Sequence, residues 1–404
     1  MNSRPLQILC LTSNDPGEPD SGGIVRARNI FQILGRLGEV RLVLASDYQN
    51  DALTPGSQHA GFKLAEAVRF PPAQRWSFTE RLRNELDPRF MNTHQVQARP
   101  EERERLLKLL AGADLVWVHN VKLANMYGLW RWPRSILDID DIPSGYYRTL
   151  LARADNRKDK LRWWRQVKIW QRRERRLLER FDTLSVCSEP DQQALAQTLG
   201  DSRRIHILPN AFPMPAQLPT RQPATPARIG FIGDLRFPPN AEGMRWFIDQ
   251  VWPLILKLAP QTRLRVAGRE GEKQPWLQVP NVDCLGWVKD IEPEMATWSL
   301  TIVPIFTGGG TRIKTLEAFS RQCPVVSTTL GVFGYDVVDG QDVQLADQPE
   351  AFAAKCLEVL AHPRLGESLA GAAWEKFKTR WTWDAQADRV LAVAQTVLSS
   401  QPQP

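Results

Sequence analysis

Residues 303–320, VPIFTGGGTRIKTLEAFS, contain the residue types that suit a phosphate group. A short apolar run of strand type ends at Phe306, and a helical pattern begins at Thr311. Three glycines separate the two: Gly308, Gly309 and Gly310. Glycines let the backbone approach a phosphate closely, and the free N–H groups at the start of a helix attract an anion. Arg312 and Lys314 in the first turn can add charge-assisted hydrogen bonds.

Glu317 adds a carboxylate on the same helix face, because it lies three residues after Lys314. A carboxylate there can accept hydrogen bonds from a ribose diol, as acidic residues do in dinucleotide sites. The arrangement predicts a site for a nucleotide diphosphate. The alternative is a tight turn followed by an ordinary Lys–Glu surface pair. A Walker A loop is excluded, because its Gly-x-x-x-x-Gly-Lys-[Ser/Thr] pattern is absent.

Two glycines in the first part of the chain can contribute to the same kind of site. Gly22 and Gly23 follow Ser21 and precede a helical pattern over residues 24–37. Ser21 can cap this helix, and the glycines can bring backbone N–H groups close to a ligand. A plain glycine-containing loop is the alternative.

Polar residues also stand at the ends of two apolar runs of strand type. His119 ends the run LVWVH, and Asp140 and Asp141 follow the run SILDI. A neutral imidazole can donate or accept a hydrogen bond at a sugar hydroxyl, and a carboxylate can orient or deprotonate an acceptor hydroxyl. A structural histidine and aspartates that cap their loop are the alternatives.

Strand-type runs alternate with helical patterns in two blocks, which predicts the α/β class with two doubly wound, Rossmann-like domains. Five prolines between residues 211 and 228 indicate a stiff linker between the blocks. The expected boundaries are a first domain over 1–212, a linker over 213–227, a second domain over 228–379 and a final helix over 380–404. Because ligands of such sheets bind outside the carboxyl ends of the strands, we expect the site in the cleft between the domains.

The 404 residues are 43% hydrophobic and 24% charged, which excludes wholesale disorder. No apolar run approaches the roughly 18–20 residues of a membrane span, and residues 1–11 lack the apolar core of a signal peptide. The five cysteines and five histidines are scattered, without a Cys-x-x-Cys pair. We therefore expect a cytoplasmic protein with no disulfide scaffold, no metal site and no cofactor.

Positive charge is concentrated in residues 148–180, which hold thirteen Lys or Arg and four Asp or Glu. Three tryptophans are interleaved with this charge: Trp163, Trp164 and Trp170. Such a segment can lie on an anionic membrane surface or a phosphorylated partner; the alternative is a solvated helix whose tryptophans pack onto the domain. Nucleic acid is not expected, because no nucleic-acid-binding motif accompanies the charge.

The sequence VPIFTGGGTRIKTLEAF, followed by CPVVST, resembles the donor-site segment of retaining glycosyltransferases of the GT-B fold, family 4, in the subgroup with a GGGTRxK loop. Further motifs occur in the order expected for that family: IGFIGDLRFPPNAEGMRWFIDQVWPLI at 229–255, VAGR at 266–269, LGWVKDI at 285–291 and RWTWDAQADRV at 380–390. In the family, the last of these segments is a helix that crosses back onto the first domain.

The resemblance implies transfer of a hexosyl unit, with retention of configuration, from a nucleotide-diphosphate sugar to a hydroxyl group. The acceptor would be a glycan or a lipid-linked molecule of cell-surface polysaccharide or glycoconjugate biosynthesis. The first domain would bind the acceptor and the second the donor, without a metal, and the donor phosphate would take the acceptor proton. The basic segment 148–180 would hold the protein peripherally on the inner face of the membrane.

The resemblance also assigns roles to single residues. His119, Arg312 and Lys314 would be catalytic, and Asp140 and Asp141 would bind the acceptor. The donor-binding residues would be Gly22, Gly23, Gly233, Arg236, Gly308, Gly309, Gly310, Thr311 and Glu317.

The chain departs from the family pattern at two positions. Many members carry two glutamates eight positions apart around this helix; Glu317 matches the second, whereas Gly309 stands at the first. Many members also have an Arg and a Lys after the first strand of the donor domain, where this chain has Gly233 and Arg236 without a nearby Lys. Two other functions stay open: a nucleotide-sugar epimerase of the same architecture, and a non-catalytic partner that binds glycan or nucleotide.

Overall fold

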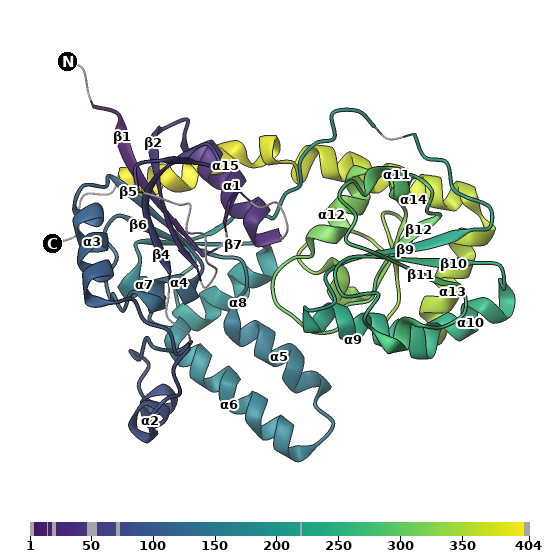
Figure 1. The fold of residues 1–404 in the computed structure, drawn as a ribbon, viewed down its shortest axis with the longest axis horizontal. Helices are drawn as coiled ribbons and strands as arrows, with labels where there is room; N and C mark the ends of the chain where they lie inside the picture. Colours follow the sequence, from purple (N-terminus) through teal and green to yellow (C-terminus); the bar gives the residue numbers. More distant parts are fainter. Residues whose placement is uncertain are drawn as a thin grey trace. The chain divides into compact units, whose positions relative to one another are not determined.

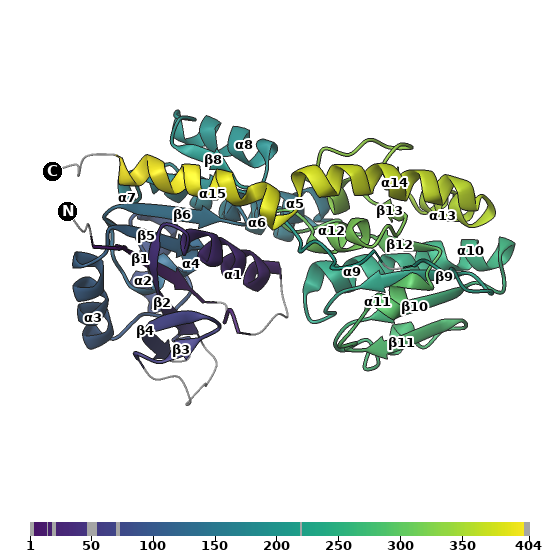
Figure 2. The same cartoon turned by 90° about the horizontal axis from the view of Figure 1, so that it is seen from above.

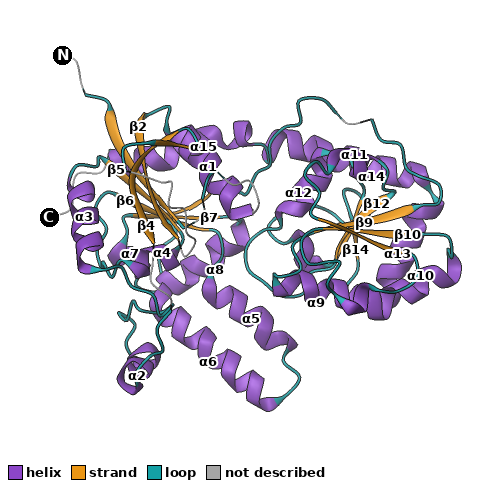
Figure 3. Ribbon diagram, viewed as in Figure 1, coloured by secondary structure: helices purple, strands orange, loops and turns teal. Residues whose placement is uncertain are grey.

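The computed structural model describes residues 4–13, 15–17, 22–46, 55–69, 73–218 and 220–399. Two compact units make up the chain: Met1–Pro209 with Gln386–Pro404, and Asn210–Ala385. Each unit has helices on both faces of a mostly parallel sheet, which confirms the predicted fold class (Figure 1, Figure 3). Residues 213–227 lie with the second unit, where the N–H groups of Gln222 and Ala224 donate to the carbonyls of Ala296 and Thr297.

The sheet of the first unit has the order β3-β4-β2-β1-β5-β6-β7-β8, and every pair is parallel except β3 with β4. Its strands are β1 (Leu6–Thr12), β2 (Gly38–Ser46), β3 (Gln58–His59), β4 (Phe62–Arg69), β5 (Leu115–His119), β6 (Ser135–Ile139), β7 (Thr183–Val186) and β8 (Ile205–Ile207). Strands β5, β6 and β7 are buried along their whole length because helices cover both faces, and so they read as near-continuous apolar runs.

The helices of the first unit are α1 (Gly22–Leu34), α2 (Phe78–Leu86), α3 (Pro100–Ala111), α4 (Val121–Met126), α5 (Pro143–Arg153), α6 (Arg157–Glu174), α7 (Leu177–Arg180) and α8 (Glu189–Leu199). The helix α15 (Trp383–Leu398) contributes its residues from Gln386 onward. Local signals explain several boundaries. Ser188 caps the start of α8, and Gly200 ends it in the left-handed conformation that glycine favours.

The sheet of the second unit is parallel throughout, with the order β11-β10-β9-β12-β13-β14. Its strands are β9 (Arg228–Ile232), β10 (Arg263–Ala267), β11 (Val282–Gly286), β12 (Leu300–Val303), β13 (Val325–Ser327) and β14 (Gln344–Leu345). Its helices are α9 (Pro238–Trp246), α10 (Trp252–Leu258), α11 (Glu292–Ala296), α12 (Ile313–Ser320), α13 (Pro349–Ala361) and α14 (Pro363–Arg380). Figure 2 shows this unit from a second side.

The helical pattern over residues 241–258 is interrupted in the structure. A π-helical turn, Phe247–Val251, joins α9 to α10, and the helix begins earlier, at Pro238, because proline fits the first turn of a helix. Residues 247, 248, 251, 252 and 255 are all buried. The wider turn therefore keeps apolar side chains of both helices in one core.

The basic segment 148–180 is not one helix. It covers the end of α5, the whole of α6 and the short α7, and α5 and α6 pack against each other as a hairpin (Figure 1). Of its tryptophans, Trp170 is buried, Trp163 stacks on Tyr147, and Trp164 is half exposed. Within the described ranges, no helix is both long enough and apolar enough to span a membrane.

Candidate active site

The order of the strands places the predicted residues at the ligand-binding edge of each sheet. In the second unit the chain runs outward from β9 to β11 and then returns to the other side of β9 with β12. Open α/β sheets bind ligands beside such a reversal, outside the carboxyl ends of the strands. Gly233 follows β9, and residues 307–312, here called the glycine loop, follow β12. In the first unit the reversal lies between β1 and β5, and His119 ends β5.

Two glycines of the glycine loop have backbone angles that other residues rarely adopt. Gly308 has a φ of 122° and Gly310 a φ of 63°. The loop is anchored by side chains at both ends. Thr307 Oγ1 donates to Glu242 Oε2 at 2.8 Å, and Asn210 Nδ2 donates to Thr311 Oγ1 at 2.8 Å. The sequence therefore builds a fixed loop directly before helix α12.

Arg312 folds back onto the glycine loop. Its Nη1 donates to the carbonyl oxygens of Gly309 and, at 2.9 Å, Gly310. A Cβ at Gly308 would lie 2.8 Å from Arg312 Nη2, so glycine is needed beside the guanidinium. Arg312 precedes α12, which begins at Ile313 rather than at Thr311, and no side chain caps this helix start.

Lys314 lies in the first turn of α12 and reaches the loop after β9. Its Nζ donates to Asn240 Oδ1 at 2.7 Å and lies 4.3 Å from the centre of the Phe231 ring. A Cβ at Gly233 would come within 2.7 Å of this Nζ, so only glycine leaves room for the ammonium group. Burial lowers the pKa of Lys314 to about 7, with the positive charge of Arg312 acting in the same direction.

Glu317 lies one turn further along α12. Burial raises the pKa of Glu317, although the charges of Arg321 and Lys314 oppose this effect. Its Oε1 lies 3.3 Å from Arg321 Nη1. The carboxylate is thus turned toward Arg321 within its own helix rather than toward a surface pair with Lys314.

Arg236, the other predicted donor contact, pairs with Asp234. Its Nε donates to both carboxylate oxygens, at 3.0 and 2.9 Å. Burial acts to raise the pKa of Asp234, but the hydrogen bonds from Arg236 outweigh it and the pKa is lowered. Arg236 is half exposed, so its guanidinium stands at the rim, whereas Lys314 lies deeper.

A buried polar cluster, Arg26 with His119, Asp138 and Ser185, occupies the reversal point of the first unit. Arg26 Nε and Nη2 donate to Asp138 at 2.8 and 2.6 Å, and both side chains are fully buried. Ser185 Oγ also donates to Asp138, at 2.7 Å. Burial acts to raise the pKa of Asp138, but the charge of Arg26 outweighs it and the pKa is strongly lowered.

His119 is held in this cluster by one ring nitrogen. Its Nδ1 lies 3.1 Å from Asp138 Oδ2, and its Nε2 lies 3.8 Å from Asp140 Oδ2. Within the described part of the chain, Nε2 has no hydrogen-bond partner. Burial acts to lower the pKa of His119, but the hydrogen bond to Asp138 and the charge of Asp140 raise it overall. The orientation of the ring is therefore fixed, and Nε2 can contact a ligand.

The remaining predicted residues of the first unit lie close by in the sequence. Asp140 Oδ1 accepts a hydrogen bond from the N–H of Asp141, whose side chain is exposed. Gly22 and Gly23 open α1, the helix that carries Arg26 one turn later. Ser21 lies outside the described residues.

Sequence reasoning missed Arg26 and Asn240 as parts of these clusters and gave Asp138 no role of its own. Arg26 interrupts the apolar face of residues 24–37, and Asp138 interrupts the apolar run SILDI. Two opposite charges in patterns of buried type would have indicated an internal ion pair. Across the described residues, no three His, Cys, Asp or Glu side chains come together as a group that could ligate a metal.

Two family models match most of the chain. A glycosyl transferase 4-like domain matches residues 21–211, and the model of glycosyl transferases group 1 matches residues 226–362. The fold agrees with that of sucrose-phosphate synthase from Thermosynechococcus elongatus, with a TM-score of 0.70 and 13% identity over 98% of this chain and all of that one. The chain is a glycosyltransferase with the GT-B fold.

Other solved structures share the fold of this glycosyltransferase. WaaG, a glycosyltransferase involved in lipopolysaccharide biosynthesis, superposes with a TM-score of 0.63 and 14% identity over 96% of this chain and 99% of that one. Anabaena Alr3699/HepE in complex with UDP-glucose gives a TM-score of 0.64 and 15% identity over 97% and 100% of the two chains.

A curated relative comes from a capsule-related region. It is an uncharacterized 44.6 kDa protein in the cps region of Klebsiella pneumoniae, 26% identical over 133 residues. The match spans 30% of this chain and 34% of the length of that relative.

Proposed function

We propose that this glycosyltransferase moves a hexosyl unit, with retention, from a nucleotide-diphosphate sugar to a hydroxyl of a glycan or lipid-linked acceptor in cell-surface polysaccharide or glycoconjugate biosynthesis. The observation that carries the proposal is the position of Lys314 Nζ, which lies between the glycine loop and the Gly233 loop at the strand-order reversal. An ammonium group at that point is suited to a diphosphate.

The proposed mechanism uses the charge that develops on the leaving diphosphate. Lys314 and Arg312 stabilise this charge more strongly in the transition state than in the ground state, and free N–H groups near the start of α12 add to the effect. In a retaining reaction of this kind, the donor phosphate takes the acceptor proton. The proposal includes neither a metal nor a cofactor, because the two cations supply the positive charge.

The acceptor side of the proposal rests on the buried polar cluster. Asp138 fixes the ring of His119, and Nε2 then hydrogen-bonds a sugar hydroxyl. Asp140, 3.8 Å from that nitrogen and partly exposed, orients the acceptor hydroxyl together with Asp141. Gly22 and Gly23 contribute backbone N–H groups at the start of α1.

A panel of nucleotide sugars tests the function. We expect calorimetry to detect binding of one or a few of them, beginning with UDP-glucose because the similar HepE structure holds it. Sugar transfer to a glycan or lipid-linked acceptor should then be detected by mass spectrometry. Conversion of the sugar without any acceptor would show an epimerase instead, and donor binding without turnover across broad acceptor panels would show a non-catalytic partner.

The lowered pKa of Lys314 predicts that donor binding takes up a proton. A diphosphate beside Lys314 raises its pKa from about 7, so uptake should rise from about 0.1 proton at pH 6 to about 0.9 at pH 8. Donor affinity should correspondingly fall as the pH rises above about 7. Calorimetry of UDP binding in buffers with different ionisation enthalpies measures the uptake. Lys314→Met should abolish it at pH 8 and the exposed Lys257→Met should not; equal uptake in the two variants would contradict the assignment.

We also propose that α2 and α6 hold the protein on the inner, cytoplasmic face of an anionic membrane. Helix α2 exposes Phe78, Leu82 and Leu86 at intervals of four residues, which is one helix face. Leu161 and Trp164 are exposed on α6, among its basic residues. The two helices are joined by an ion pair of 3.0 Å between Arg165 and Glu85. Apolar side chains beside positive charge suit a bilayer surface.

Vesicle sedimentation checks this membrane contact. The protein should sediment with vesicles that contain phosphatidylglycerol and remain free with phosphatidylcholine alone. The double variant Phe78→Ser/Leu82→Ser should bind about tenfold more weakly, because two apolar side chains no longer enter the bilayer. Leu258→Ser, at an equally exposed apolar position of the second unit, is the matched control. Equal binding to both vesicle types would refute the proposal.

A further inference from the structure

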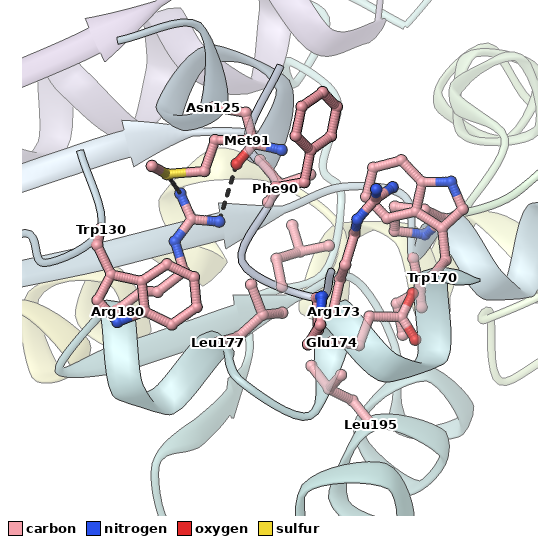
Figure 4. A pocket seen from close by; sticks show the side chains of 15 residues that line it. Phe90, Met91, Asn125, Trp130, Trp170, Arg173, Glu174, Leu177, Arg180 and Leu195 are labelled. Atoms are coloured by element: carbon pink, nitrogen blue, oxygen red, sulfur yellow. Dashed lines mark hydrogen bonds between the residues drawn. The ribbon is translucent and has the colours of Figure 1, made fainter. Parts of the chain in front are cut away.

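A narrow pocket in the first unit lies under helices α4, α6 and α7 (Figure 4). It measures about 500 Å³ including its open mouth. Most of its wall is apolar and comes from Phe90, Met91, Trp130, Trp170, Leu177 and Leu195. The width of the pocket suits a slender chain-like group rather than a sugar ring. Two arginines nevertheless form part of the same wall, Arg173 and Arg180.

Arg180 is buried and held only by uncharged groups. Its side chain is 5% exposed, Nη1 donates to Asn125 Oδ1 at 2.8 Å, and Met91 Sδ lies 3.9 Å from Nη2 (Figure 4). The guanidinium also lies 5.4 Å from the centre of the Trp130 ring. Nε has no hydrogen-bond partner among the described residues. Burial lowers the pKa of Arg180 to about 10, and no acidic group offsets this effect.

Arg173 is in a similar state. It is 8% exposed, and Nη2 donates to the carbonyl and side-chain oxygens of Asn84, both at 2.8 Å. Its Nε has no hydrogen-bond partner in the described ranges, and its guanidinium lies 5.2 Å from the centre of the Trp170 ring. Burial lowers the pKa of Arg173 to about 10, and the charges of Asp87 and Glu85 offset this only in part.

The acidic residue of the pocket wall does not neutralise these arginines. Glu174 accepts hydrogen bonds from the backbone N–H and the hydroxyl of Ser144, at 2.8 and 2.6 Å, so both of its oxygens are used at the start of α5. Burial raises the pKa of Glu174, which favours its neutral form. Two buried positive charges thus lie beside an apolar pocket without a matched anion. Such charges are costly unless they are paired.

We propose that this pocket binds an amphiphile with a slender apolar chain and a phosphate group, and that Arg173 and Arg180 bind the phosphate. The chain lies between Phe90, Trp170 and Leu195, where it removes apolar surface from water. Guanidinium groups bind phosphate through paired N–H donors, and each arginine still has an Nε donor to offer.

The place of the pocket links this amphiphile to the acceptor. Ile139 and Ile142 line the pocket, and Asp140 and Asp141 are the two residues between them. Trp170 belongs to α6, one of the helices proposed to touch the membrane. If the proposed function holds, the amphiphile is therefore the lipid phosphate part of the acceptor, and its sugar end lies toward Asp140.

Binding of simple probes to the full chain tests this site. Calorimetry should be carried out with decyl phosphate, 1-decanol and inorganic phosphate, all below the concentration at which decyl phosphate forms micelles. We expect decyl phosphate to bind at least tenfold more tightly than either of the other two. Equal binding of decyl phosphate and decanol would show a purely apolar pocket, and equal binding of decyl phosphate and inorganic phosphate a simple anion site. Either result, like the absence of binding, overturns the proposal.

Variants locate the site. Arg173→Met and Arg180→Met should each weaken decyl phosphate binding about tenfold and leave decanol binding unchanged. Lys168→Met, which removes one exposed charge from the same helix, should have no effect. An equal loss in Lys168→Met would overturn the proposal in favour of non-specific charge. Because the comparison of the three probes needs no substitution, it decides the proposal even where an arginine variant fails to fold.

A donor-binding measurement on the same preparation separates this proposal from the proposed function. UDP-glucose binding without decyl phosphate binding would refute the pocket and leave the glycosyltransferase assignment standing. Decyl phosphate binding without binding or transfer of any nucleotide sugar would support the pocket and refute its role in an acceptor site.

Discussion

Replacing Lys314 with alanine should lower the rate of sugar transfer about 10²–10³-fold while the fold survives. The expected loss equals that of removing one preorganised group that stabilises transition-state charge. Lys314 Nζ has Asn240 as its hydrogen-bond partner and lies over Phe231, so its removal breaks one hydrogen bond and leaves the strands of the second unit in place. Transfer should be followed as released UDP, and the fold by circular dichroism and thermal unfolding.

Two companion variants sharpen this result. Glu317→Ala should also strongly reduce transfer, mainly through weaker donor binding, because the carboxylate is proposed to hold the ribose diol. Lys257→Ala, at an exposed position of α10, should retain full activity. Full activity in both Lys314→Ala and Glu317→Ala would remove the donor site from α12.

Replacing Arg26 with methionine should destabilise the first unit by about 3–5 kcal/mol, because Asp138 is then left as a buried charge without its partner. The hydrogen bonds from Ser185 and His119 do not supply the lost positive charge of the guanidinium. Urea unfolding followed by circular dichroism measures the change. At low pH the loss should become smaller, since protonation of Asp138 removes the uncompensated charge.

A matched set of variants isolates the ion pair in this experiment. Arg28→Met, on the same helix but partly exposed, should change stability little. The double variant Arg26→Met/Asp138→Leu should recover part of the lost stability, because an apolar pair avoids the burial of a lone charge. A loss in the double variant as large as the sum of the two single losses would show that the two charges do not interact.

The sequence predicted the parts of the fold whose signals are local. The apolar runs at β5, β6 and β7, the glycine loop and helix α12 all have patterns that extend over a few neighbouring residues, and the structure contains each of them. Helix α12 begins two residues later than predicted, because Arg312 is extended and turns its side chain back to the loop. The roles assigned to Lys314 and Glu317 stay predictions until the variants are measured.

Features that depend on distant residues were not predicted. Arg26 and Asp138 are 112 positions apart, and their pairing follows from the order of the strands rather than from any local pattern. Lys314 and Asn240 are 74 positions apart. The stretch between β2 and β5 gave no element in the sequence analysis, although it holds β4, α2 and α3. Helix α2 in particular has a capping box at Ser77 and Glu80 that a search for helix starts would have found.

The π-helical turn between α9 and α10 constrains how this protein can vary in length. Each residue of a helix advances the chain by about 100° around the axis. Removal of one residue from Phe247–Val251 would regularise the turn but rotate the following segment by that angle, carrying Trp252 and Ile255 out of the core that they now fill. Insertions and deletions should therefore be tolerated in the loops around this helix and selected against inside it, which makes the turn a fixed spacer behind the Gly233 loop.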